Sequence, residues 1–175
     1  RAWTAVFRRK RPPPRSRHVS RTENGSRSDV GRERERCIMK YEFTDDYLTG
    51  IASVDEQHAK LFDLTNECYD LVMESAAEDK YDKIVDILEE LGTYAGTHFA
   101  SEEAYAERVG DPHRFSHRAL HLRFMKKVGE IDLEKVDENQ QEYLLNILDF
   151  LARWLFDHIK GRDCRLPHAD EAQQA

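Results

Sequence analysis

Six ionisable residues stand at positions where the sequence pattern predicts the apolar core of a helical protein. They are His58, His98, Glu102, His117, His121 and His158. Burying such groups without partners costs several kcal/mol each. A single core histidine is commonly satisfied by one hydrogen bond, but one glutamate cannot neutralise five imidazoles. These side chains must therefore satisfy one another or share a metal.

The spacing of these residues favours the metal. His98 and Glu102 are four residues apart, and so are His117 and His121. Side chains at this spacing lie on one face of a helix, so each pair points toward a common target. One such pair alone is weak support for a metal site. Two pairs together with two further core histidines predict a shared site.

Apolar residues recur at intervals of three and four along four segments, which predicts four helices. Ser53 and Glu56 form a capping-box pattern, in which the serine caps the helix and the glutamate reaches back to it. Asp111-Pro112 is a cap residue followed by proline at the first helical position. The helices predicted from these and similar signals span residues 53–75, 79–109, 111–131 and 137–160.

Short connections between long helices favour antiparallel neighbours, so the sequence predicts an all-α, up-down-up-down four-helix bundle. In such a bundle the starts of the first and third helices meet the ends of the second and fourth. His58 and His117 lie near helix starts, whereas His98, Glu102 and His158 lie near helix ends. At a rise of about 1.5 Å per residue, all six ionisable groups fall in a layer roughly 10–15 Å thick at one end of the bundle.

The chain of 175 residues divides into a basic part and an acidic part. Residues 1–40 carry thirteen Lys and Arg against four Asp and Glu, and residues 41–175 carry fourteen against thirty. The first part lacks apolar periodicity, which predicts a disordered basic extension. Alternatively it is sequence upstream of a natural start at Met39, or a nucleic-acid-binding or targeting arm. The bundle is predicted over residues 41–166, followed by a flexible tail over 167–175.

The acidic charge of the predicted bundle argues against nucleic acid as its partner, because phosphate contacts need Lys and Arg. No apolar run approaches about 18 residues, so we expect no transmembrane helix and no membrane partner. The three cysteines are widely spaced and form no Cys-x-x-Cys motif. This pattern fits a reducing cytoplasm better than a disulfide framework, and Cys68 falls at a core position as a small apolar residue. We therefore expect a cytoplasmic protein.

Four motifs occur in order between residue 41 and about residue 166. They are Gly50-Ile51-x-x-Val54-Asp55-x-Gln57-His58-x-x-Leu61, His98-Phe99-x-x-Glu102-Glu103, His117-x-x-x-His121 and Trp154-Leu155-x-x-His158-Ile159-x-x-x-Asp163. In this order and spacing they resemble the signature of the hemerythrin family, whose members are four-helix bundles. The resemblance implies a cofactor of two iron ions (Fe2+/Fe3+) joined by an oxo or hydroxo bridge.

The ligands that the resemblance implies are His117, His121 and His158 for one iron, His58 and His98 for the other, and Glu102 and Asp163 as bridges between them. Asp163 would not be chosen from periodicity, because it lies about 140° round an ideal helix from His158. Gly161, between the two, would let the last helical turn loosen and swing Asp163 inward. One coordination position stays open on the iron with two histidines, and the resemblance implies that dioxygen binds there.

We therefore interpret the chain as a protein that binds dioxygen reversibly for storage, transport or sensing, and not as an enzyme. A di-iron redox enzyme, or a module that senses iron, redox state or nitric oxide, is the alternative. A protein recipient or effector is a further conceivable partner. Glu103 is predicted to point away from the site, and the histidines that are not expected to be ligands are His18, His113 and His168. The residues that the resemblance places around the oxygen pocket are Phe99, Trp154, Leu155 and Ile159.

Overall fold

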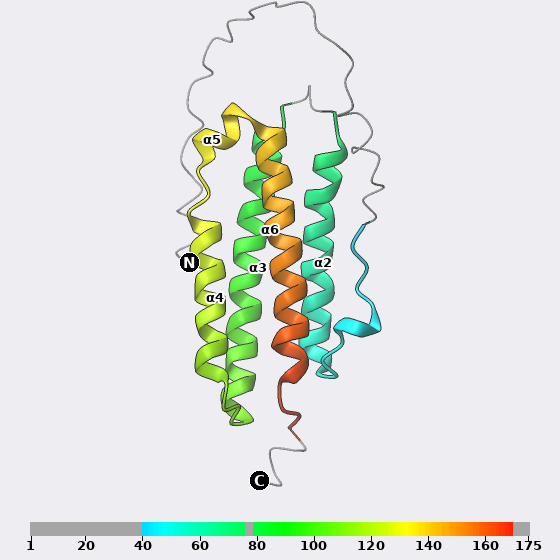
Figure 1. The fold of residues 1–175 in the computed structure, drawn as a ribbon, viewed down its shortest axis with the longest axis vertical. Coiled ribbons are helices and arrows are strands. Elements are labelled where there is room, and N and C mark those ends of the chain that lie inside the picture. Colours follow the sequence, from blue (N-terminus) through cyan, green and yellow to red (C-terminus); the bar gives the residue numbers. More distant parts are fainter. Residues whose placement is uncertain (1–39, 76–78, 170–175) are drawn as a thin grey trace, which may run out of the picture.

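The computed structural model describes residues 40–75 and 79–169 of the chain. These residues form helices and no strands, and the predicted all-α, up-down-up-down bundle is confirmed (Figure 1). Of the predicted basic extension only Lys40 lies within the described residues, and residues 170–175 of the predicted tail lie outside them. The elements in order are η1 (Asp45–Tyr47), α2 (Ala52–Met73), α3 (Tyr81–Arg108), α4 (Arg114–Gly129), α5 (Leu133–Glu138), α6 (Gln140–Gly161) and η2 (Asp163–Arg165).

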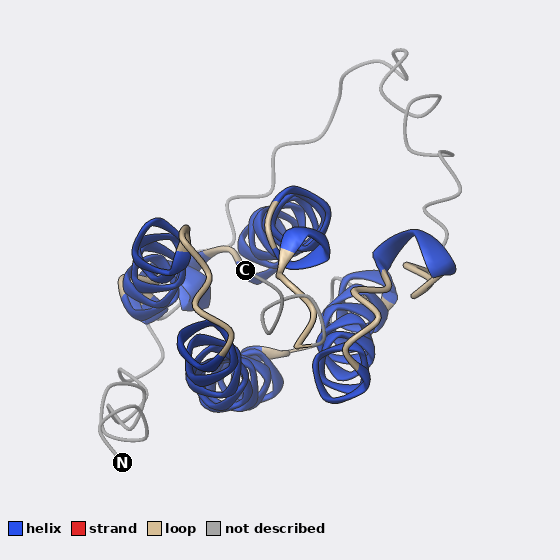
Figure 2. Ribbon diagram, turned by 90° about the horizontal axis from the view of Figure 1, so that it is seen from below, coloured by secondary structure: helices blue, strands red, loops and turns tan. Residues whose placement is uncertain are grey.

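The four long helices α2, α3, α4 and α6 run alternately in opposite directions, with their connections at the two ends of the bundle (Figure 1). Helix α3 packs against α2 and α4, and α6 packs against α2. Figure 2 shows the long helices nearly end-on around their common core. No helix in the described part of the chain is both long and apolar enough to cross a membrane.

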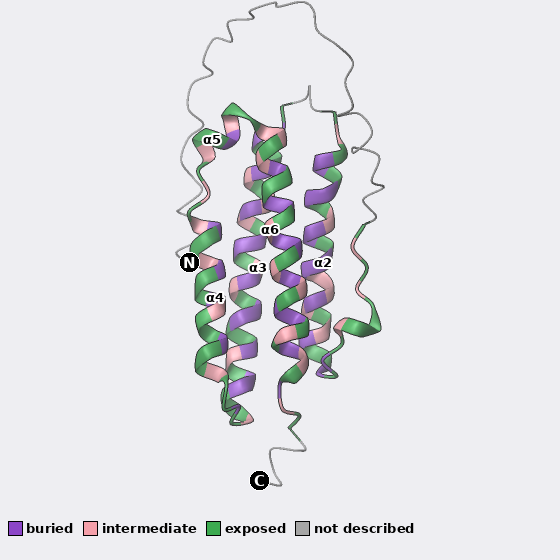
Figure 3. Ribbon diagram, in the orientation of Figure 1, coloured by how far each residue is buried: buried purple, intermediate pink, exposed green. Residues whose placement is uncertain are grey.

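Each long helix buries one face, which appears as purple bands on the inward sides in Figure 3. The core stripes predicted from spacing are buried along α2, α3 and α6, as Leu61, Leu88 and Leu151 illustrate. Cys68 is fully buried among these apolar side chains, and burial raises the pKa of its thiol to about 12. Ile131, predicted as the last core residue of the third helix, is only partly buried because α4 ends at Gly129.

The turn before α2 positions the helix that carries His58. The helix begins one residue before Ser53, so the predicted capping box is wrong. The carboxylate of Asp55 instead accepts hydrogen bonds from Thr49 N at 2.7 Å, Thr49 Oγ1 at 2.6 Å and Gly50 N at 3.1 Å. Gly50 adopts φ +77°, and a Cβ there would lie 2.8 Å from the ring of His168. The turn therefore requires glycine.

The predicted starts of the last two helices also differ from the structure. Helix α4 begins at Arg114 and not at Asp111, because the carboxylate of Asp111 accepts a hydrogen bond from the backbone N–H of His113 and holds a turn ahead of the helix. Asp137, predicted to open the last helix, lies inside the short α5. Asn139 caps α6 instead, since its side chain accepts a hydrogen bond from a backbone N–H of the first turn.

A buried lysine closes the other end of the bundle. Lys80 is 2% exposed, and its ammonium group donates to Leu71 O at 2.6 Å, Glu74 O at 2.9 Å and Gln141 Oε1 at 3.2 Å. Two of these acceptors are backbone carbonyls at the end of α2, where no helical N–H remains to pair with them. The lysine thus ties the end of α2 and the start of α6 to the start of α3, far from the histidine layer.

We predict that Lys80→Met lowers the free energy of unfolding by about 1–3 kcal/mol, because it leaves two helix-end carbonyls without a donor. Urea unfolding followed by circular dichroism measures the change. Lys126→Met removes a lysine that is 74% exposed and should change the stability by less than about 0.5 kcal/mol. Equal stability of the two variants would contradict the structural role given to Lys80.

Candidate metal centre

Helices α2 and α4 begin, and α3 and α6 end, at the same end of the bundle (Figure 1). Seven ionisable side chains meet there. None is more than 4% exposed. They form two groups whose donor atoms lie within 4.8 Å of one another, and Glu102 belongs to both. The first group is Glu102, His117, His121 and His158, and the second is His58, His98, Glu102 and Asp163. The structure thus brings together every residue that the sequence reasoning proposed as a ligand.

The first group presents three imidazole nitrogens to one point. His158 Nε2 lies 3.0 Å from His117 Nε2 and 2.9 Å from His121 Nε2. Nitrogens bound to one metal at about 2.1 Å lie about 3.0 Å apart when they are at right angles, and about 3.4 Å apart in a tetrahedron. The spacing of these nitrogens therefore matches one face of an octahedral site better than it matches a tetrahedral site.

Asp163 lies between the two groups. Its Oδ1 is 2.9 Å from His117 Nε2 and 3.2 Å from His158 Nε2, while its Oδ2 is 3.2 Å from His58 Nε2. Helix α6 ends at Gly161, and the chain then turns into η2, so Asp163 leaves the helical spacing that would have directed it away. One carboxylate therefore offers one oxygen to each group.

Two hydrogen bonds orient the imidazoles from outside. His98 Nδ1 donates to Gln57 Oε1 at 2.9 Å, and His121 Nδ1 donates to Glu103 Oε1 at 3.1 Å, because both oxygens are acceptors. A neutral imidazole with its proton on Nδ1 turns the lone pair of Nε2 inward. The prediction that Glu103 points away from the site is wrong. The Glu103 carboxylate reaches across from α3 to α4, although it is 29% exposed.

Several buried polar atoms in the interior of the site lack a hydrogen-bond donor. Both oxygens of Glu102, both oxygens of Asp163 and both ring nitrogens of His58 have no hydrogen-bond partner among the described residues. Because His98 and His121 carry their protons on Nδ1, their Nε2 lone pairs and the Glu102 oxygens are acceptors that face one another without a hydrogen bond. Buried acceptors in this arrangement are satisfied by a cation between them. The residues present therefore fit a pair of metal ions.

Burial controls the protonation of the metal-free site. Burial, reinforced by the neighbouring His58, lowers the pKa of His98 to about 3, and burial lowers the pKa of His158 to about 3 as well. Burial also raises the pKa of Glu102. The pKa of Asp163 is lowered in spite of its burial, because the imidazoles of His117 and His58 face it. Neutral imidazoles are the form that binds metals, so no proton needs to leave His98 or His158 near neutral pH.

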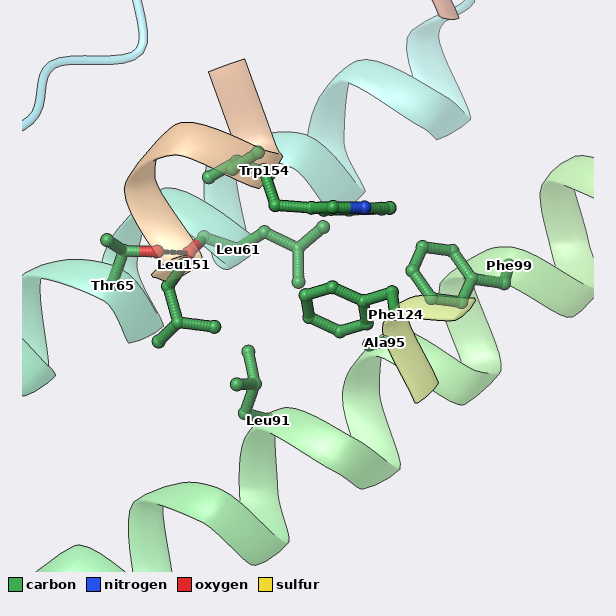
Figure 4. Close-up of a pocket in the computed structure, with 9 residues that line it drawn as sticks. Leu61, Thr65, Leu91, Ala95, Phe99, Phe124, Leu151 and Trp154 are labelled. Carbon is green, nitrogen blue, oxygen red and sulfur yellow. Dashed lines mark hydrogen bonds between the residues drawn. The ribbon is translucent and has the colours of Figure 1, made fainter. Parts of the chain in front are cut away.

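Aromatic rings hold the first group in place. Phe99 stacks on His121 with 4.0 Å between ring centroids, and Trp154 stacks on His158 with 4.2 Å. Beyond these rings lies a cavity of about 10 Å³, lined mainly by apolar side chains (Figure 4). Its one hydroxyl, that of Thr65, already donates to Leu61 O at 2.9 Å.

Three of the four residues predicted around an oxygen pocket, Phe99, Trp154 and Leu155, line this cavity. The fourth, Ile159, is buried at 1% exposure but does not line it. His113 and His168 lie outside both donor groups, and His18 lies outside the described residues. The residues that sequence reasoning missed are Gln57 and Glu103, which flank core positions and contact histidines on neighbouring helices.

Comparison with known proteins agrees with this fold and site. The family model for the hemerythrin HHE cation binding domain matches residues 49–165. A bacteriohemerythrin of Clostridium acetobutylicum is 39% identical over 119 residues, covering 68% of this chain and 92% of that protein. A bacteriohemerythrin of Stenotrophomonas maltophilia is 32% identical over 122 residues, covering 68% and 74%. A hemerythrin-like protein of Naegleria gruberi is 28% identical over 119 residues, covering 68% and 84%.

No solved structure matches the chain. The fold and the site define a helical-bundle protein with buried histidine and carboxylate clusters able to hold metal ions. The family model covers well over half of the sequence, and the chain belongs to the hemerythrin family.

We predict that the metal-free protein loses stability on acidification. Between pH 6.5 and 4.5, the ordinary pKa values of histidine and glutamate, the unfolded chain binds protons at His98 and His158 that the folded chain does not bind. Glu102 acts in the opposite sense, because its raised pKa lets the folded chain keep a proton there. Two histidines outweigh one glutamate, so the free energy of unfolding should fall with each pH unit as the protein is acidified from pH 6.5 to 4.5.

Urea unfolding of protein kept metal-free with a chelator measures this slope. Replacing His98 and His158 together by Gln should flatten or reverse it, whereas His113→Gln, at an exposed position outside the site, should leave it unchanged. Stability that rises as the wild-type protein is acidified would contradict the pKa values given to the buried histidines.

Proposed function

We propose that this chain binds dioxygen reversibly at a non-haem pair of iron ions, for oxygen storage, transport or sensing and not for catalysis. In this proposal one iron is held by one set of imidazoles and the other by a second set, with two carboxylates and an oxo or hydroxo group shared between them. The ligands are His117, His121 and His158 for the first iron, His58 and His98 for the second, and Glu102 and Asp163 for both.

The position of Asp163 is the observation that carries the proposal. A carboxylate with one oxygen 2.9 Å from His117 Nε2 and the other 3.2 Å from His58 Nε2 is suited to bridge two metals. Five imidazoles supply five bonds, two bridging carboxylates four and a shared single-atom bridge two. Two octahedral ions held by these residues would need twelve, so one position would remain for an exogenous ligand, on the side of His58 and His98.

When bound, a pair of ferrous ions supplies the two electrons that reversible binding of dioxygen requires. The protein's own residues hold and shield the pair. Gln57 and Glu103 orient two imidazoles, while the stacked rings of Phe99 and Trp154 and the cavity behind them keep water from the site. A dry surrounding would limit the delivery of protons to the metal pair.

The donor set favours carriage over catalysis. Imidazole ligands outnumber carboxylates five to two, whereas di-iron carboxylate proteins of the ferritin-like type use two Glu-x-x-His motifs with two further glutamates. A less anionic site is suited to binding oxygen without activating it further. The relatives named bacteriohemerythrin support this choice. The two described cysteines are unpaired, which supports the predicted cytoplasmic location.

The proposal is tested by loading the protein with ferrous iron without air, admitting oxygen and recording the visible spectrum through cycles of deoxygenation. We expect two irons per chain and a charge-transfer band that appears with oxygen and disappears on its removal. Rapid bleaching with release of hydrogen peroxide, or turnover with a reductant, would contradict reversible binding and favour the alternative of a redox enzyme.

We further predict that His98→Ala retains about one iron per chain and loses the oxygen-dependent band, because no neighbouring side chain replaces the lost nitrogen. Iron is counted by elemental analysis after gel filtration. The matched control is His113→Ala, which removes an exposed histidine outside both donor groups and should keep two irons and the full band. Two irons per chain and a full oxygen-dependent band in His98→Ala would contradict the assignment of His98 as a ligand.

A further inference from the structure

The two donor groups differ in what supports their histidines from outside. In the second group, His98 Nδ1 donates to the neutral amide oxygen of Gln57, and His58 Nδ1 has no hydrogen-bond partner among the described residues. In the first group, His121 Nδ1 donates to a carboxylate, that of Glu103. The other oxygen of this carboxylate, Oε2, lies 3.3 Å from Nε of Arg118.

This difference changes how strongly each imidazole binds a cation. A carboxylate that accepts the Nδ1 proton pushes electron density into the ring and makes the opposite nitrogen a better donor, whereas a neutral amide does so much less. Partners of this kind commonly change metal affinity by about 10–100-fold. Both partners fix the same tautomer, so Gln57 and Glu103 differ mainly in charge.

The number of imidazoles acts in the same direction. The first group offers three imidazole nitrogens, with two contacts of 3.0 and 2.9 Å between them, and the second group offers two. The stacked rings of Phe99 and Trp154 restrain His121 and His158 further. The first group is therefore better prepared to bind a metal before any ligand side chain has to move.

We propose that Glu103 and Gln57 are positioning residues that make the two metal sites unequal. The site of His117, His121 and His158 fills first and holds its metal more tightly, and the site of His58 and His98 fills second and exchanges its metal more readily. This inference rests on the proposed function for the presence of two metals, but it concerns the order of binding and not the reaction with oxygen.

Two isosteric substitutions separate charge from geometry. Glu103→Gln keeps an oxygen that accepts the His121 proton but removes the negative charge. Gln57→Glu keeps an oxygen that accepts the His98 proton and adds a negative charge. A purely structural role for these residues would leave metal affinity unchanged in both variants, because both keep the hydrogen bond. If the residues act through their charge, Glu103→Gln should weaken metal binding at the first step and Gln57→Glu should strengthen it at the second step.

The experiment is a titration of the metal-free full chain with Co2+, followed by calorimetry and by the visible spectrum of the bound ion. For the wild type we expect two separate binding steps. Glu103→Gln should weaken the first step about 10–100-fold and leave the second unchanged. Gln57→Glu should strengthen the second step and bring the two closer together. Glu107→Gln makes the same charge change on the next turn of α3, at an exposed position, and should reproduce the wild type.

The outcomes distinguish this inference from the proposed function. If the wild type binds fewer than two metal ions, the proposed di-iron site itself fails. If it binds two ions in one indistinguishable step, or if Glu103→Gln weakens both steps equally or neither, only the inequality of the sites is overturned. Opposite shifts in the two variants, with an unchanged Glu107→Gln control, support the inference.

Discussion

The burial of acceptors against acceptors at one end of the bundle is the constraint on which the rest of the structure depends. The oxygens of Glu102 and Asp163 and both ring nitrogens of His58 have no hydrogen-bond partner among the described residues. A layer of this kind opposes folding unless positive charge enters it. We regard the surrounding packing, the external hydrogen bonds and the terminal turn of α6 as the means by which the chain holds this layer together.

The two ends of the bundle contribute differently: one end stabilises the fold, and the other positions the ligand side chains. At the end far from the site, apolar side chains and the buried ammonium group of Lys80 supply stability that does not depend on metal. At the site end, the turn held by Asp55 sets the first turns of α2, and Asp111 holds the turn that precedes α4. Both helices thus begin at a defined position along the bundle axis. This places His58 and His117 at the same position along that axis as the histidines of α3 and α6.

Much of this arrangement could be predicted from the sequence because helical spacing is a local property. Residues four apart, such as His117 and His121, share a face whatever the neighbouring helices do. Asp163 lies beyond the last helical turn, so periodicity could not direct it and only the family resemblance suggested it. Glu103 and Gln57 were missed for a related reason. Their hydrogen bonds cross between helices, and the relative height of two helices depends on turns whose caps the sequence reasoning placed one to three residues away.

The central claim is that one carboxylate-bridged pair of metal ions occupies the layer between the four helices. Crystals of the iron-loaded protein, measured on both sides of the iron absorption edge, test it most directly through anomalous difference density. We expect two iron peaks, one among the Nε2 atoms of His117, His121 and His158 and one beside His58 and His98, with Asp163 between them. A single peak, or peaks away from these side chains, would contradict it.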